Sequence, residues 1–182
     1  MLDRGAGGST CWGKHRGNDR ASKGKECIMP TPLERREVLP AHPLPAGLAA
    51  PAAWQLRVDG LVAQPLVLSL SEVDALEAQA HAADFVCEEG WVVPAQRWEG
   101  VAIAAVLARA GVQPAARFLK VHAGDFTVLL PLEEALAGGA LLRLVAPGRA
   151  CWYSVKWVDR LELLAEEAAT TGEGLAHARL QR

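Results

Sequence analysis

The feature that most limits the possible folds is the regular interruption of short apolar stretches by turn-forming residues between positions 54 and 165. Apolar and polar residues alternate from Trp54 to Val58, which is the pattern of a strand with one buried face. Asp59-Gly60 follows as a tight turn. Further strands are predicted over residues 66–70, 81–86, 117–121, 126–130, 141–146, 153–158 and 161–164. The fold class is therefore predicted to be α+β, mostly β, rather than a doubly wound parallel sheet.

Three short helices are expected between these strands, over residues 71–79, 102–110 and 132–137. In the first, Ser71 and Asp74 have the spacing of a capping box. Gly111 has the position of a C-cap for the second helix. Pro131 suits the start of the third helix, because a helix start needs no hydrogen bond from that nitrogen.

One domain is expected, since 182 residues with 51% hydrophobic content can fill a single core. Residues 1–28 are rich in Gly, Lys, Arg and Ser and are predicted to be a disordered tail. Residues 29–53 are dense in Pro and Ala, which predicts an extended arm lying on the domain. The domain itself is placed at residues 54–165, and residues 166–182 are predicted to be a tail with a frayed helix.

Several classes of function are disfavoured. The net charge of -2 and the absence of a basic run with interleaved aromatics argue against a nucleic-acid partner. No apolar run approaches the length of a membrane span. Charge and prolines follow Arg35-Arg36, so this twin arginine is interpreted as two solvated charges rather than as a signal, and a cytoplasmic location is expected. The four cysteines have no metal-site or disulfide spacing and are expected to be free thiols.

Cys87 is the main candidate for chemistry. It ends the predicted strand 81–86 and is followed by Glu88-Glu89-Gly90-Trp91. A cysteine at a strand end is commonly a small buried hydrophobic residue, but two carboxylates are unusual neighbours for a core position. Nearby carboxylates raise the pKa of a thiol, which favours a metal ligand over an activated nucleophile. The residues alone leave both a core role and a metal-binding role open.

A second candidate is a set of cations in the C-terminal third. They lie in or beside apolar segments, so they either extend into solvent or bind an anion. Lys156 stands out because Val155 and Trp157 flank it, in a stretch whose backbone amides could face a phosphate. His122 follows a buried-looking strand and is interpreted as a core histidine with its own partner. The cations are Arg143, Arg149, Lys156 and Arg160.

Short motifs occur in a fixed order along residues 54–165. They are Trp-Gln-Leu-Arg-Val-Asp-Gly-Leu-Val at 54–62, Pro-Leu at 65–66, Leu-Ser-Leu at 68–70, Asp-Phe-Val-Cys-Glu-Glu-Gly-Trp at 84–91, Trp-Glu-Gly-Val at 98–101, Leu-Pro-Leu-Glu-Glu-Ala-Leu at 130–136, Leu-Arg-Leu-Val-Ala-Pro-Gly at 142–148 and Ser-Val-Lys-Trp-Val at 154–158. This ordered set resembles the molybdopterin-binding domain of the sulfite-oxidase superfamily. Within it, the chain is most similar to small bacterial members related to the catalytic subunit of the protein-methionine-sulfoxide reductase.

The resemblance implies a molybdenum–molybdopterin cofactor, with Cys87 as the protein's ligand to the metal. Glu89 takes the position of a carboxylate that would face the open side of the metal and handle protons. The other implied contacts bind the pterin or its phosphate. They are Arg143, Ser154, Val155, Lys156 and His122.

The resemblance also implies an oxidoreductase that carries out oxygen-atom transfer or a related two-electron reaction on a small molecule. A separate haem or flavin protein is the implied electron partner, since the chain has neither a CxxCH motif nor a Gly-rich dinucleotide fingerprint. Glu-Glu-Gly-Trp replaces the segment that carries the sulfite-binding arginines of sulfite oxidases, so sulfite is not the expected substrate.

Near residues 140–143 one strand and loop of the family are shortened. Two alternatives to a molybdenum-dependent oxidoreductase remain open. One is a cofactor-free binding or remnant domain that lost a cofactor-contacting loop, and the other is a cysteine-based enzyme without a metal.

Overall fold

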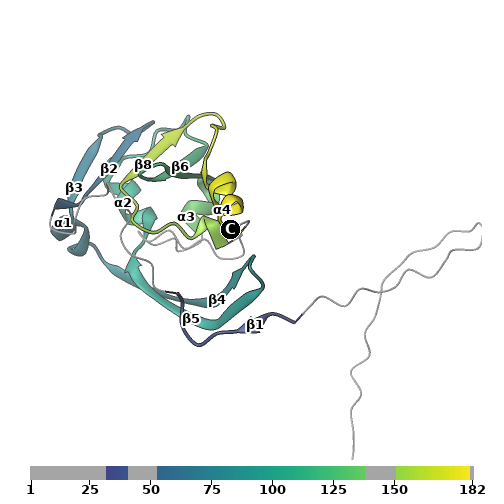
Figure 1. Ribbon diagram of the computed structural model, residues 1–182. Coiled ribbons are helices and arrows are strands. Elements are labelled where there is room, and N and C mark those ends of the chain that lie inside the picture. Colours follow the sequence, from purple (N-terminus) through teal and green to yellow (C-terminus); the bar gives the residue numbers. More distant parts are fainter. Residues whose placement is uncertain (1–31, 41–52, 138–150, 181–182) are drawn as a thin grey trace, which may run out of the picture. The chain divides into compact units, whose positions relative to one another are not determined.

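The computed structural model describes residues 32–40, 53–137 and 151–180, and its strands form two β-sheets with short helices between them (Figure 1). The prediction of an α+β, mostly β fold is confirmed. Among the predictions of the fold, the disordered tail at 1–28, the strand at 141–146 and the shortened loop near 140–143 lie outside the described residues.

The larger sheet has five strands in the order β3-β2-β8-β6-β7. Neighbouring strands are antiparallel, except that β2 and β8 run parallel. The sequence prediction located each of these strands to within about two residues, because each has a local apolar pattern. Their bounds are β2 Gln55–Gly60, β3 Leu66–Ser69, β6 Phe118–Ala123, β7 Phe126–Pro131 and β8 Arg160–Leu164.

The main core lies against one face of this sheet. Residues alternate between buried and less buried along β6 and β8, so one face carries buried apolar side chains and the other carries most of the polar ones. Helix α2 (Ile103–Ala110) buries Ile103, Val106, Leu107 and Ala110, which share one side of a helix. Gly111 caps α2 with φ 71°, as the sequence predicted. Helix α3 (Leu132–Ala137) adds buried residues to the same core and has the predicted bounds.

The smaller sheet has three strands in the order β1-β5-β4: β1 Glu34–Arg35, β4 Ala78–Cys87 and β5 Trp91–Val101. β5 was not predicted, because Pro94 interrupts its pattern and a proline normally argues against a paired strand. The pairing with β4 is irregular at that point. Ala95 has φ 48°, and its amide donates to Asp84 Oδ1 at 2.8 Å. The irregularity therefore accommodates the proline without ending the strand.

The first helix differs from its prediction. Helix α1 spans only Leu70–Asp74, and its capping box is formed by Ser69 and Glu72 rather than by Ser71 and Asp74. Ser69 is the last residue of β3, and its extended backbone (φ -72°, ψ 164°) is the conformation that an N-cap requires. The helix ends after Asp74, well before residue 79, and the chain enters β4 at Ala78.

The strand predicted at residues 153–158 is wrong. The chain there forms a 3-10 helix, η2 (Cys151–Tyr153), closed by a hydrogen bond from the Ser154 amide to the Cys151 carbonyl at 2.9 Å. Trp157 has φ 61°, which lies outside the extended region that regular strand residues adopt. Alternating apolar side chains are necessary for a half-buried strand but are not sufficient. At residues 153–158 the backbone conformation excludes a strand.

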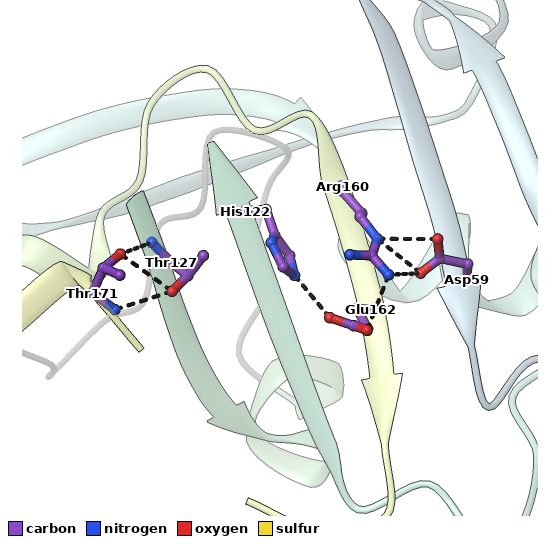
Figure 2. Close-up of polar contacts among 6 residues, drawn as sticks. All are labelled: Asp59, His122, Thr127, Arg160, Glu162 and Thr171. Carbon is purple, nitrogen blue, oxygen red and sulfur yellow. Dashed lines mark hydrogen bonds and ion pairs between the residues drawn. The ribbon is translucent and has the colours of Figure 1, made fainter. Parts of the chain in front are cut away.

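The C-terminal helix α4 (Gly172–Leu180) is anchored at its start. The amides of Thr127 and Thr171 each donate to the other's hydroxyl, at 2.9 and 3.1 Å (Figure 2). A Cβ on Gly172 would lie 2.9 Å from the Thr127 carbonyl oxygen, so only glycine fits there without displacement. α4 thus packs on β7, the edge strand of the larger sheet. None of the described helices is long and apolar enough to cross a membrane.

Candidate functional site

Cys87 is the last residue of β4 and pairs with Trp91, the first residue of β5. Glu88, Glu89 and Gly90 form the turn between them. The Gly90 amide donates to the Cys87 carbonyl at 3.0 Å, and Gly90 has φ 86°. A three-residue hairpin loop needs one residue in the left-handed region, which glycine adopts without strain. The turn therefore holds Cys87 at a defined place at the end of the sheet.

The Cys87 thiol is buried among apolar groups. It is 8% exposed and packs with Trp91 and Val93, and with the partly buried Leu39 and Phe85. Burial raises the pKa of Cys87 to about 12; the neighbouring Cys151 thiol and, last, the charge of Glu89 act in the same direction, and the Glu89 amide acts against them. The direction is the one the sequence suggested, but the chief cause is desolvation of the thiolate rather than the neighbouring carboxylates. Cys87 is therefore a neutral thiol in this surrounding.

A second thiol touches the first. Cys151 Sγ lies 3.4 Å from Cys87 Sγ, and Cys151 is the first residue of η2. The two cysteines are 64 positions apart in sequence and have no motif spacing, so sequence analysis gave Cys151 no role. Only the tertiary contact between η2 and β4 brings them together.

The segment predicted to bind the cofactor follows Cys151 directly. The amides of Ser154 and Val155, expected to face a phosphate, donate within the turn to the Cys151 and Tyr153 carbonyls at 2.9 and 3.0 Å. Val155 is 3% exposed and belongs to the main core. Lys156 is therefore carried by a backbone that is fixed immediately before it. The fold thus connects the Cys87 thiol, through Cys151, to the predicted Ser154–Lys156 segment.

Glu89 and a cation from the N-terminal arm meet at Trp91. Glu89 Oε2 accepts a hydrogen bond from Trp91 Nε1 at 2.9 Å. The Arg36 guanidinium lies 4.7 Å from the Trp91 ring centroid and also pairs with Glu34 at 3.1 Å. The hydrogen bond with Glu34 is the main reason that the pKa of Arg36 is raised, and the charges of Glu34 and Glu89 add to it. Arg36 is thus a site residue that sequence analysis missed.

The pairing of β1 with β5 explains this omission. Glu34 lies opposite Trp91 and Arg35 opposite Val92 in a parallel register. Arg36, which was interpreted with Arg35 as a solvated charge, also stacks on an aromatic ring. A two-residue strand has no sequence signal of its own.

His81 is a further residue that sequence analysis did not consider. Exposure alternates along β4, which places His81, Phe85 and Cys87 on its less exposed face. His81 Nε2 is buried and has no hydrogen-bond partner among the residues that the structure describes. Buried polar atoms almost always have a partner, so one without a partner on the Cys87 face needs an explanation.

His122 lies in a different setting, on the less buried face of the larger sheet (Figure 2). Its Nε2 is 3.0 Å from Glu162 Oε2. Glu162 also pairs with Arg160 at 3.0 Å, and Arg160 pairs with Asp59 at 2.9 Å. We call these four residues the ion ladder. The contact with Glu162 gives His122 the expected partner, but His122 lies outside the main core, so it is not the core histidine that was predicted. Arg143, another predicted cofactor contact, lies outside the described residues.

Comparison with known proteins identifies the family. Residues 41–171 match the family described as the oxidoreductase molybdopterin binding domain. The chain belongs to this family. It is 30% identical to "Uncharacterized oxidoreductase YuiH" of Bacillus subtilis (strain 168), over 62% of this chain and 66% of that protein. The chain therefore spans just under two thirds of this relative.

A solved structure supports the fold. The sulfane dehydrogenase SoxCD from Paracoccus pantotrophus superposes with a TM-score of 0.61 at 21% identity, covering 68% of this chain and 41% of that one. The predicted molybdopterin-binding fold is confirmed by these matches. Within the described residues, no three or more His, Cys, Asp or Glu side chains gather as a metal-binding group.

Proposed function

We propose that this chain is the cofactor-binding part of a molybdenum oxidoreductase, with Cys87 as the protein's ligand to the metal. The observation that carries the proposal is the buried Cys87 thiol, held by the hairpin turn in a chain that matches the molybdopterin-binding family. Bound there, the cofactor would supply oxygen-atom transfer or a related two-electron reaction. The substrate is proposed to be a small molecule other than sulfite.

The donor set suits such a cofactor. A pterin dithiolene brings its own sulfur ligands, so the protein needs to add only one soft donor, and a cysteine thiolate is such a donor. The pKa of Cys87, about 12, means that the thiol keeps its proton until a cation replaces it. Cys87 would therefore bind the metal with release of a proton, and the apolar surrounding would keep water from the new bond.

His81 supplies a second, independent observation. Leaving a buried nitrogen without a hydrogen bond costs about 1–3 kcal/mol. The polar ring atoms of a bound pterin would give His81 Nε2 a partner on the face that also carries Cys87. We therefore propose His81 as a cofactor contact, beside the contacts implied by the resemblance.

The other proposed roles follow the charges of the side chains. Glu89, held by Trp91 Nε1 at the mouth of the hairpin, would accept or release protons during the reaction. Lys156, supported by the turn at Ser154 and Val155, would hold the pterin or its phosphate, and Arg143 would do the same. We also propose a separate haem or flavin protein as the electron partner.

Elemental analysis tests the proposal. The full chain is produced in a host that makes the cofactor, and molybdenum is measured per chain for the wild type, Cys87→Ser and Cys27→Ser. The wild type and Cys27→Ser, the control for loss of a thiol, are expected to contain a stoichiometric amount of metal, and Cys87→Ser almost none. A folded wild type without metal would sink the proposal and favour the cofactor-free remnant domain.

A second variant tests His81. His81→Leu is expected to lower the amount of molybdenum retained after dialysis, because the cofactor loses a hydrogen bond. The urea stability of the cofactor-free protein should not fall, since the replaced nitrogen bonds to none of the described residues. If the variant instead destabilises the cofactor-free protein and retains the metal, His81 has only a packing role.

A further inference from the structure

Cys87 and Cys151 are placed as a pair that can be cross-linked. Their sulfurs are 3.4 Å apart, and both are free thiols. A disulfide bond is about 2.0 Å long, so the sulfurs would have to approach by about 1.4 Å. Cys151 is at the start of a three-residue 3-10 helix rather than inside a sheet, so a rotation of its side chain and a small backbone shift could close this gap.

The two thiols differ in their access to solvent. Cys87 is 8% exposed, whereas Cys151 is only partly buried. An oxidant in solution therefore meets Cys151 first, and Cys87 lies next to it within contact distance. This is the arrangement of an accessible thiol beside a resolving thiol.

We propose that Cys87 and Cys151 form a reversible disulfide in the cofactor-free protein, and that this bond masks the sulfur that the cofactor needs. The claim that the bond masks a cofactor ligand rests on the proposed function of Cys87. The claim that the bond forms does not. The oxidant is a small-molecule disulfide, RSSR. The Cys151 thiolate attacks RSSR and releases one RS⁻. The neutral Cys87 thiol then attacks the Cys151 sulfur of the mixed disulfide, and its proton passes to the second sulfur, which leaves as RSH.

The reaction is balanced without another reagent. Two protein thiols lose two protons and two electrons, and RSSR becomes two RSH. Reduction by a dithiol reverses it. The bond would also protect Cys87 from irreversible oxidation while no metal occupies it. It would tie the hairpin of β4 and β5 to η2, the element that leads into Lys156.

Mass spectrometry tests the bond. The full chain is made in a host unable to synthesise the cofactor, reduced, treated with oxidised glutathione and alkylated. We expect a loss of two hydrogens, a peptide that links Cys87 to Cys151, and protection of both from alkylation. The double variant Cys11→Ser/Cys27→Ser should keep the link, and Cys151→Ser should lose it. Free alkylation of Cys87 and Cys151, or a stable glutathione adduct on Cys151 without the link, would overturn the proposal.

Loading separates the two halves of the proposal. Cofactor released from another molybdenum protein is added to the oxidised and reduced forms, and bound molybdenum is measured. Loading of the reduced form alone, with Cys151→Ser loading whether oxidised or not, supports masking. Equal loading of both wild-type forms overturns masking. A linked protein that binds no metal in either state overturns masking and the proposed function together, while the mass spectrum still establishes the bond.

Discussion

The two sheets differ in whether their partly buried polar side chains have partners within the protein. On the larger sheet, the ion ladder joins His122, Glu162, Arg160 and Asp59 through contacts of 3.0 Å or less (Figure 2). On the smaller sheet, the face that carries Cys87 has a buried His81 nitrogen without a partner in the described part of the chain, and a thiol whose polar contact is another thiol. The ladder is complete without a ligand, whereas the Cys87 face is not.

This difference separates residues that stabilise the fold from residues that are available for chemistry. Charges that are partnered within the protein gain little from a ligand, because binding one would break existing hydrogen bonds. Buried groups without a partner gain a hydrogen bond when a ligand arrives. The comparison therefore gives more weight to Cys87 and His81 as cofactor contacts than to His122, although the resemblance implied a role for His122.

The largest expected effect concerns metal content. Cys87→Ser should lose almost all molybdenum, whereas His122→Gln should retain it, because the His122 imidazole is already bonded to Glu162. Both are measured by elemental analysis on protein from a cofactor-producing host. Loss of metal from His122→Gln, with a native circular dichroism spectrum, would restore His122 as a cofactor contact and remove the distinction between the two sheets.

The next effect concerns stability. Arg160→Met should lower the free energy of unfolding by about 1.5 kcal/mol, since it leaves the carboxylates of Asp59 and Glu162 partly buried without their cation. Urea denaturation of the cofactor-free protein measures this. Arg57→Met is the matched control, because Arg57 lies opposite Arg160 in the β2–β8 register but is exposed. Equal losses in the two variants would mean that the ladder adds nothing.

Local pattern was enough to predict much of the larger sheet. Its five strands, helix α2 with its Gly111 cap and the bounds of α3 each have signals within a few residues of themselves. The Cys87 turn was also predictable, since Glu88-Glu89-Gly90 contains the glycine that a tight hairpin needs. In each case the physical cause acts between neighbours in sequence.

The parts that escaped prediction depend on contacts distant in sequence. Cys151 reaches Cys87 across 64 positions, and Arg36 reaches Trp91 through a two-residue strand. Two errors have local causes instead. β5 was missed because an irregularity in its hairpin pairing with β4 accommodates Pro94, and the strand at 153–158 was overpredicted because side-chain alternation does not reveal the φ of Trp157. All of these features lie near Cys87 in the sheet or in the chain that follows Cys151.

A smaller effect tests the turn that presents Cys87. Gly90→Ala should cost about 1 kcal/mol, because φ 86° is unfavourable for a residue with a Cβ. A Cβ at Gly90 or at Gly174 would meet no atom within 4 Å, so sterics do not distinguish them. Gly174 lies in α4, where alanine should be neutral or stabilising. Urea denaturation of both variants isolates backbone strain, and equal stabilities would show that the turn can relax.

The smallest expected effect is a pH dependence of the ladder. Burial lowers the pKa of His122 below its ordinary 6.5, with Arg160 and Lys120 acting in the same direction and Glu162 against it. The unfolded chain therefore takes up a proton at a higher pH than the folded protein does. Stability should decrease as the pH falls from about 6.5 towards the lowered pKa, and it should be unaffected by this group above that window.

His122→Gln should remove this part of the pH dependence while leaving the rest of the curve in place. The measurement is the urea midpoint of the cofactor-free wild type and variant at several pH values, at constant salt. If the two curves run parallel between pH 5 and 7, roughly the range in which histidines titrate, His122 does not sense pH. If the wild type instead becomes more stable on acidification, the ion pair with Glu162 raises the pKa of His122 more than burial lowers it. A charged imidazole would then stabilise the ladder.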